Sequence, residues 1–138
     1  MAKSIRDAMT SNPCAIDADK SVAYAAKMMR DEDVGFAPIV KGDRLIGAVT
    51  DRDIAVKVVG EGKNPEATKV LEIASTDLVT VYPDQDLNEA LLLMAHNQVR
   101  RLPVVGQDGE LVGVLAQADV AQKADAAETG RMVEEISE

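Results

Sequence analysis

The 138 residues, 46% of them hydrophobic, suffice for one ordinary domain or two very small ones, and they argue against a disordered chain. The formal net charge of -9 argues against nucleic acid as the main partner, because binding a phosphate backbone requires clustered Lys and Arg. The charge leaves room for a small phosphorylated ligand at a local cationic spot.

The only cysteine is Cys14, which excludes an intramolecular disulfide and argues against a Cys-based zinc site. We therefore expect no metal and no required cofactor. The N-terminal MAKSIRDAMTS lacks the apolar run of a signal peptide. No stretch approaches the roughly 18 apolar residues of a membrane span. The sequence therefore predicts a cytoplasmic protein without a membrane partner.

The chain repeats itself: residues 5–10 align with residues 70–75, and later segments align in the same order. In the first copy, Ser21 is the expected N-cap of a helix, because apolar residues recur after it at helical spacing. Asp86 has the same place in the second copy. The expected strands and helices are, in chain order, 14–16 (β), 22–29 (α), 37–40 (β), 44–49 (β) and a helix from 50, then 79–81 (β), 87–94 (α), 102–105 (β), 110–115 (β) and a helix from 116.

Each copy thus has the predicted order β-α-β-β-α. We expect domains at 5–60 and 66–124, joined by the Gly- and Pro-containing segment 60–65, and an acidic, helix-prone tail at 125–138. A domain of about sixty residues is marginal on its own, so the two copies should bury their sheets against each other. The expected fold is α/β (α+β), with the repeats packed as a pseudo-twofold pair.

The motif GAVTDRD (47–53) has the chemistry of a candidate binding site. Gly47 would let another group approach the strand backbone closely. Thr50 falls at a strand-to-helix junction, where free N–H groups suit anions, and Asp53 could accept two hydrogen bonds from a ribose diol. The same residues are explained without a ligand if Thr50 is an N-cap and Asp53 a carboxylate favoured by the helix dipole. Both interpretations stay open.

The repeated β-α-β-β-α order, the segment RLPVV (101–105) and the pattern Gly-hydrophobic-x-Thr-x-x-Asp resemble the cystathionine-β-synthase-type domain, or CBS domain. The resemblance runs from about Ile5 to Lys123 and is to a tandem CBS pair, or Bateman module, similar to small stand-alone bacterial CBS-pair proteins. It implies a ligand sensor and not an enzyme. Such pairs commonly bind AMP, ADP, ATP or S-adenosylmethionine in two clefts, with the Asp on the ribose and the Thr or Ser on phosphate.

Carried over residue by residue, the resemblance implies two unequal clefts, each completed by the other unit. The first has the hydroxyl motif and two arginines, and each charge-assisted bond to phosphate would contribute about 1.5–3 kcal/mol. The first would combine Thr50, Arg52, Asp53, Ser75, Thr80, Val99, Arg100 and Arg101. The second has Ala116 in place of the hydroxyl residue, so we expect it to be empty or to take an uncharged nucleoside-like group. The second would combine Thr10, Cys14, Val34, Gly35 and Asp119.

The leading hypothesis is therefore a module that binds an adenine nucleotide. The alternatives are a protein-interaction scaffold that has lost ligand binding and an S-adenosylmethionine sensor. We expect a homodimer, formed through helix faces, and an unidentified protein target. Cys14 is expected to be buried and inert. His96, with no Cys or His partner in the sequence, is expected to have no metal or catalytic role.

Overall fold

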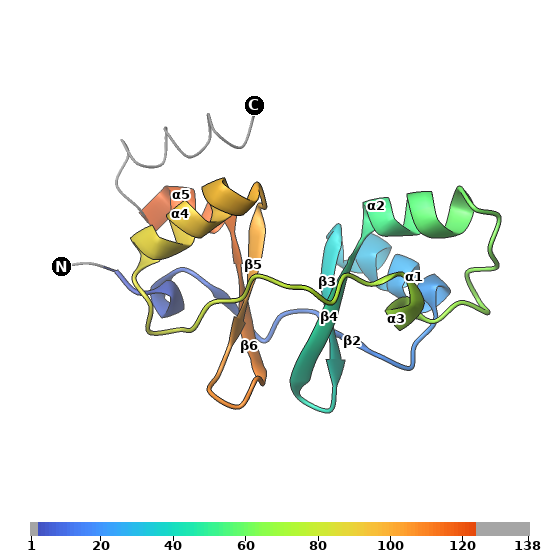
Figure 1. Cartoon of the computed structure of the whole chain (residues 1–138), viewed down its shortest axis with the longest axis horizontal. Helices are drawn as coiled ribbons and strands as arrows, with labels where there is room; N and C mark the ends of the chain where they lie inside the picture. Colours follow the sequence, from blue (N-terminus) through green and yellow to red (C-terminus); the bar gives the residue numbers. More distant parts are fainter. Residues whose placement is uncertain (1–2, 124–138) are drawn as a thin grey trace. The chain divides into compact units, whose positions relative to one another are not determined.

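The computed structural model describes residues 3–123, so the predicted tail at 125–138 lies outside the described residues. The chain forms two compact units, drawn in Figure 1. The central unit is Cys14–Leu78, and the flanking unit combines Met1–Pro13 with the chain from Val79 onward. The chain thus passes from one unit to the other within the first segment of each repeat. Residues 60–65, the expected linker, lie inside the central unit.

The central unit has a three-stranded sheet in the order β2-β3-β4, parallel between β2 and β3 and antiparallel between β3 and β4. Its helices lie on one side of this sheet (Figure 1). The elements are β2 (Ile16–Asp17), α1 (Val22–Glu32), β3 (Phe36–Lys41), β4 (Arg44–Thr50), α2 (Asp51–Ile54), the π-helical segment η2 (Ala55–Val59) and α3 (Val70–Ile73).

The flanking unit has a three-stranded sheet in the order β1-β6-β5, with both pairings antiparallel. A parallel bridge from Val81 to Val104 extends it beyond β5. Helices α4 and α5 again lie on one side of the sheet (Figure 1). The elements are the 3-10 helix η1 (Ile5–Asp7), β1 (Thr10–Ser11), α4 (Leu87–Asn97), β5 (Arg101–Val105), β6 (Leu111–Ala116) and α5 (Gln117–Lys123).

The two long helices begin where the sequence predicts. The Ser21 side chain accepts a hydrogen bond of 3.1 Å from the Tyr24 amide, and the Asp86 side chain accepts one of 2.9 Å from the Asn88 amide. These bonds satisfy amides that the first helical turn leaves unpaired. The buried residues of the two helices are apolar: Val22, Ala25 and Met29 in α1, and Leu87, Ala90, Leu91 and Met94 in α4. The predicted α/β class and the repeated order of elements are confirmed.

The first segment of each repeat pairs with the sheet of the other repeat. Thr10, from the first repeat, pairs with Val114 in β6. Ser75, from the second repeat, pairs with Ala48 in β4. The predicted element order does not include these pairings. A two-residue strand is too short to show the alternation that identifies strands in a sequence.

The short helices before these segments are exchanged in the same way. The Ile5 amide donates to the Gln85 carbonyl at 2.9 Å, and the Val70 amide donates to the Lys20 carbonyl at 3.0 Å. Ile5 and Val70 are both fully buried, each in the core of the other repeat's sheet. Each unit therefore needs both repeats to complete its core. No helix among residues 3–123 is long and apolar enough to cross a membrane.

Candidate functional site

Thr50 and Asp53 form a closed capping box where β4 ends and α2 begins. The Thr50 side chain accepts a hydrogen bond of 3.1 Å from the Asp53 amide. In return, Asp53 Oδ2 accepts from the Thr50 amide at 2.9 Å and from Thr50 Oγ1 at 3.0 Å. This reciprocal arrangement satisfies both residues within the chain. The interpretation of Thr50 as an N-cap is therefore confirmed.

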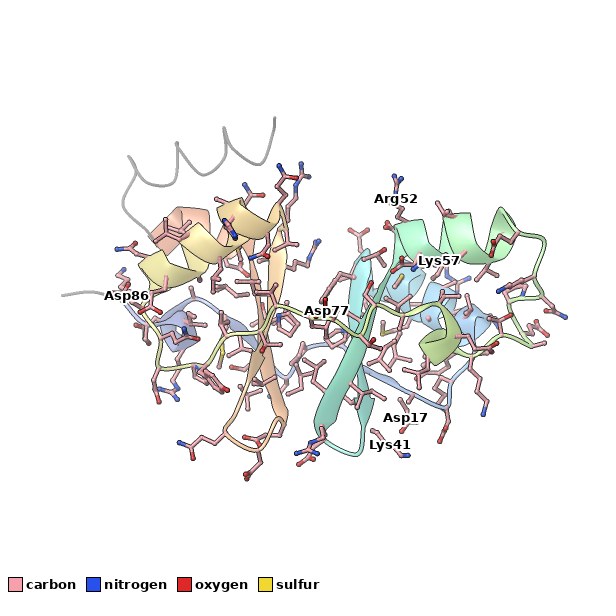
Figure 2. The ribbon with its side chains drawn as sticks, in the orientation of Figure 1. Asp17, Lys41, Arg52, Lys57, Asp77 and Asp86 are labelled. Atoms are coloured by element: carbon pink, nitrogen blue, oxygen red, sulfur yellow. The ribbon has the colours of Figure 1, made fainter. Side chains whose placement is uncertain are left out.

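Lys57 approaches the other oxygen of the same carboxylate. Its Nζ lies 3.2 Å from Asp53 Oδ1 and also donates to the Ile73 carbonyl at 3.1 Å. The Asp53 side chain is 17% exposed and that of Lys57 is 44% exposed. Figure 2 shows Arg52 and Lys57 on opposite sides of the α2 ribbon. The site therefore holds a cation, Lys57, that the sequence-based set omitted. Its spacing of four residues from Asp53 on a helix was the available indication.

The strand glycine of the motif admits the exchanged segment. A Cβ on Gly47 would lie 3.1 Å from the Ser75 carbonyl oxygen. A Cβ on Gly113, at the matching place in the second repeat, would lie 2.8 Å from the Thr10 carbonyl oxygen. The predicted close approach at Gly47 is thus made by the protein's own backbone. This explains why a glycine stands there in both copies.

The connection from α1 to β3 meets the same junction in the central unit. Phe36 pairs with Thr50 across β3 and β4, and the Gly35 carbonyl accepts a hydrogen bond of 3.0 Å from the Asp51 amide. A Cβ on Gly35 would lie 2.7 Å from Asp51 Oδ2, so the Asp51 side chain would have to move to admit one. Val34 and Gly35, which the resemblance places in the second cleft, therefore lie beside Thr50 within one unit.

The junction in the flanking unit has the same backbone but different side chains. Arg101 pairs with Ala116, and the Arg100 carbonyl accepts a hydrogen bond of 2.7 Å from the Gln117 amide. Both arginines are exposed. Ala116 has no hydroxyl, so it cannot form the side-chain cap that Thr50 forms. Asp119 is half-buried in the first turn of α5.

The residues of each predicted cleft belong to both units, so the two clefts stay predictions. Ser75 lies in the same unit as Thr50, and Thr10 lies in the same unit as Asp119, because their segments are exchanged between the repeats. The predicted site residues of the central unit are Cys14, Val34, Gly35, Thr50, Arg52, Asp53 and Ser75. Those of the flanking unit are Thr10, Thr80, Val99, Arg100, Arg101 and Asp119.

The expectation that Cys14 is buried is wrong, because the residue is exposed. It precedes β2, outside the buried part of the sheet, where the chain enters the central unit. Partial burial of the sulfur, and then the Glu32 carboxylate to which the thiol donates, raise the pKa of Cys14. A raised pKa keeps the thiol protonated and slows its reactions as a nucleophile. Within residues 3–123, no group of three or more His, Cys, Asp and Glu residues is placed to hold a metal ion.

The chain resembles known proteins over most of its length. The CBS domain model matches residues 5–60 and 70–125. The chain is 39% identical over 118 residues to the CBS domain-containing protein YhcV of Bacillus subtilis. The alignment covers 86% of this chain and 83% of that protein. It is 35% identical over 118 residues to Hypoxic response protein 1 of Mycobacterium tuberculosis, with coverages of 85% and 82%.

Solved structures agree with these matches. The crystal structure of Hypoxic Response Protein I with two coordinated zinc ions has a TM-score of 0.80 at 33% identity, over 88% of this chain and 99% of that chain. The CBS domain pair of protein MJ0100, in complex with 5′-methylthioadenosine and S-adenosyl-L-methionine, has a TM-score of 0.79 over 88% and 95% of the two chains. At 23% identity, this second likeness concerns the fold alone.

Proposed function

The chain belongs to the CBS-domain family, with CBS domains at residues 5–60 and 70–125, and from this membership we propose that it binds an adenine nucleotide as a regulatory ligand. The observation that carries the proposal is the Asp53 carboxylate, which Thr50 fixes at the end of β4 and which stays 17% exposed. In the MJ0100 pair, which shares the fold, both bound ligands contain an adenosyl group.

The residue roles in this proposal follow from their chemistry. Asp53 would accept hydrogen bonds from the ribose hydroxyls, and the exposed Arg52 would pair with phosphate oxygens. Arg100 and Arg101 of the flanking unit are also exposed and could supply further cations. Ser75, Thr80 and Val99 would complete the first cleft. The second cleft would use Thr10, Cys14, Val34, Gly35 and Asp119, and it would bind phosphate more weakly because Ala116 lacks a hydroxyl.

A thermal-unfolding screen with AMP, ADP, ATP and S-adenosylmethionine tests the proposal, because a ligand that binds only the folded state raises Tm. Asp53→Asn is the decisive variant: an amide oxygen can still accept the Thr50 cap bonds, whereas the charge and one acceptor oxygen are lost. We expect AMP or ATP to raise Tm and Asp53→Asn to remove the shift. Asp84→Asn, at an exposed position of the flanking unit, is the control. No shift with any of the four at millimolar concentration would refute the proposal.

A second candidate function, a protein-interaction scaffold, is supported by the outer face of α4. Leu92 on this helix is 70% exposed. It borders a hollow of about 650 Å³ lined by Gln85, Glu89, Leu92, Leu93, Ala95 and His96. An exposed leucine beside a hollow offers a partner apolar surface to bury, which favours association. A second copy of the chain is the simplest occupant, which agrees with the expected homodimer.

Light scattering on the purified chain tests this second function. We expect a dimer whose Kd rises at least tenfold in Leu92→Lys, because a charge would replace apolar contact area. Lys27→Ala on α1, at the matching position of the first repeat, should leave the dimer unchanged. A monomeric wild-type chain would exclude a homodimer through α4. A dimer that forms equally well in Asp53→Asn would show that assembly and nucleotide binding are separate properties.

A further inference from the structure

We propose that Lys57 determines which ligands the Thr50–Asp53 junction accepts, favouring anionic nucleotides over neutral nucleosides and over sulfonium compounds such as S-adenosylmethionine. This inference rests on the proposed nucleotide binding and identifies the ligand class by its charge. It arises from the contacts of one carboxylate, that of Asp53.

The Asp53 carboxylate is nearly saturated by the chain itself. Oδ2 accepts two hydrogen bonds from Thr50, and Oδ1 forms an ion pair with Lys57 Nζ at 3.2 Å. A carboxylate offers roughly four lone-pair sites; Thr50 uses two of them, and the Lys57 ammonium faces the oxygen that carries the other two. A ribose diol donates two hydrogen bonds. For the diol to bind through both hydroxyls, one of the present donors must leave.

Lys57 is the donor that can leave. The Thr50 amide belongs to the backbone, and the Thr50 hydroxyl also accepts the Asp53 amide in the cap of α2. Lys57 instead reaches Asp53 along a flexible four-carbon stem, with 44% of its side chain exposed. A salt bridge between helix residues four apart is weak, and solvent screens it further. The ligand therefore meets little resistance in displacing Lys57.

Displacement leaves the ammonium charge without an anion. Of the two groups that Lys57 contacts, only the Ile73 carbonyl at 3.1 Å would remain, and it is neutral. A phosphate on the ligand replaces the lost carboxylate as the partner of Lys57. A neutral nucleoside supplies no such partner, and a sulfonium adds a like charge nearby. The same exchange that admits the ribose therefore discriminates by ligand charge.

Arg52 differs from Lys57 in one testable respect. Arg52 is exposed on the other side of α2 and does not contact the Asp53 carboxylate in the described structure (Figure 2). Replacing Arg52 should weaken anionic ligands and leave a neutral nucleoside unchanged. Replacing Lys57 should weaken AMP relative to adenosine and should also make adenosine itself bind more tightly, because Asp53 Oδ1 is then free. The direction of the change in adenosine affinity separates the two cations.

Isothermal titration with AMP, adenosine and S-adenosylmethionine tests the inference on the wild-type chain, Lys57→Met, Lys57→Arg and Arg52→Ala. Lys63→Met is the matched control, because Lys63 lies in the same unit and also pairs with a carboxylate. Its side chain is 48% exposed, and its Nζ lies 3.9 Å from Glu61 Oε2. We expect the ratio of AMP to adenosine affinity to fall about tenfold in Lys57→Met, the loss of one charge-assisted contact, and to recover in Lys57→Arg. Lys63→Met should keep the wild-type ratio.

Two results overturn the inference, and they are distinguishable. If AMP and adenosine bind but their ratio is unchanged in Lys57→Met, Lys57 does not select ligands, and the proposed nucleotide binding stands. If neither ligand binds the wild-type chain, the proposed function fails and the inference fails with it. Thermal unfolding of each variant without ligand verifies folding, and Lys57→Gln repeats the test with a shorter neutral side chain.

Discussion

Ser75 and Ala48 exchange two backbone hydrogen bonds of 2.9 Å each, although they come from different repeats. The pairing adds the start of the second repeat to the sheet of the first. In the same way, Thr10 at the start of the first repeat pairs with Val114 in the sheet of the second. The exchanged segment also carries Ile73, whose carbonyl accepts from Lys57. The candidate site on the first repeat is therefore supported by residues of the second.

Replacing Ile5 with alanine tests the exchange of segments. Ile5 is fully buried in the core of the flanking unit, so Ile5→Ala should lower the free energy of unfolding by about 2–5 kcal/mol. Hydrogen exchange should show the loss of protection in α4, β5 and β6, although Ile5 belongs to the first repeat. Val70 is the residue of the second repeat that matches Ile5. Leu71→Ala, at the exposed position next to Val70, is the control and should have little effect. Loss of protection confined to α1 and β3 would contradict the exchange.

The capping box predicts opposite effects for two substitutions. Asp53→Ala removes the acceptor for the Thr50 amide and hydroxyl, and should lower the free energy of unfolding by about 1–2 kcal/mol. Ala116→Thr places a hydroxyl three residues before Asp119, and should raise it by about 0.5–1 kcal/mol by building the missing cap. Urea unfolding of both variants measures the differences. An unchanged or lower stability of Ala116→Thr would show that the second junction cannot form the box.

The strand glycines predict graded costs. A Cβ on Gly113 would lie 2.8 Å from the Thr10 carbonyl oxygen, which is backbone and cannot turn away. We expect Gly113→Ala to lower the free energy of unfolding by about 1–3 kcal/mol, and Gly47→Ala, with 3.1 Å to the Ser75 oxygen, to have a smaller effect. Met9→Ala should not rescue Gly113→Ala, since the clash with the backbone remains. Complete rescue would assign the clash to the Met9 sulfur instead.

The thiol of Cys14 should react slowly for an exposed cysteine. Partial burial of its sulfur and the neighbouring Glu32 carboxylate raise its pKa, so at a given pH near 8 a smaller fraction is thiolate. Glu32→Gln removes the negative charge, lowers the pKa towards its ordinary value and should speed alkylation at that pH. Asp33→Asn, one residue further along, is the control and should leave the rate unchanged. Equal rates in all three proteins would show that Glu32 does not act on the thiol.

Local patterns made much of the fold predictable. The helix that begins after Ser21 follows from a capping side chain and apolar spacing within one contiguous segment, and the structure has both. The cap at Thr50 was predictable for the same reason. The exposure of Cys14 could not be predicted in this way. The apolar residues that follow it in the chain do not determine how much of its own side chain is covered.

The sequence by itself determined the repeat, the two long helices with their caps at Ser21 and Asp86, and the hairpin strands that follow them, because each element depends on residues close together in the chain. Only the tertiary structure decided that Ser75 joins the strand of Ala48 and that Lys57 reaches the Ile73 carbonyl. A pairing of one or two residues carries no periodicity of its own. The strand with which such a short segment pairs depends on where another backbone can approach closely. Here the glycines at 47 and 113 allow that approach.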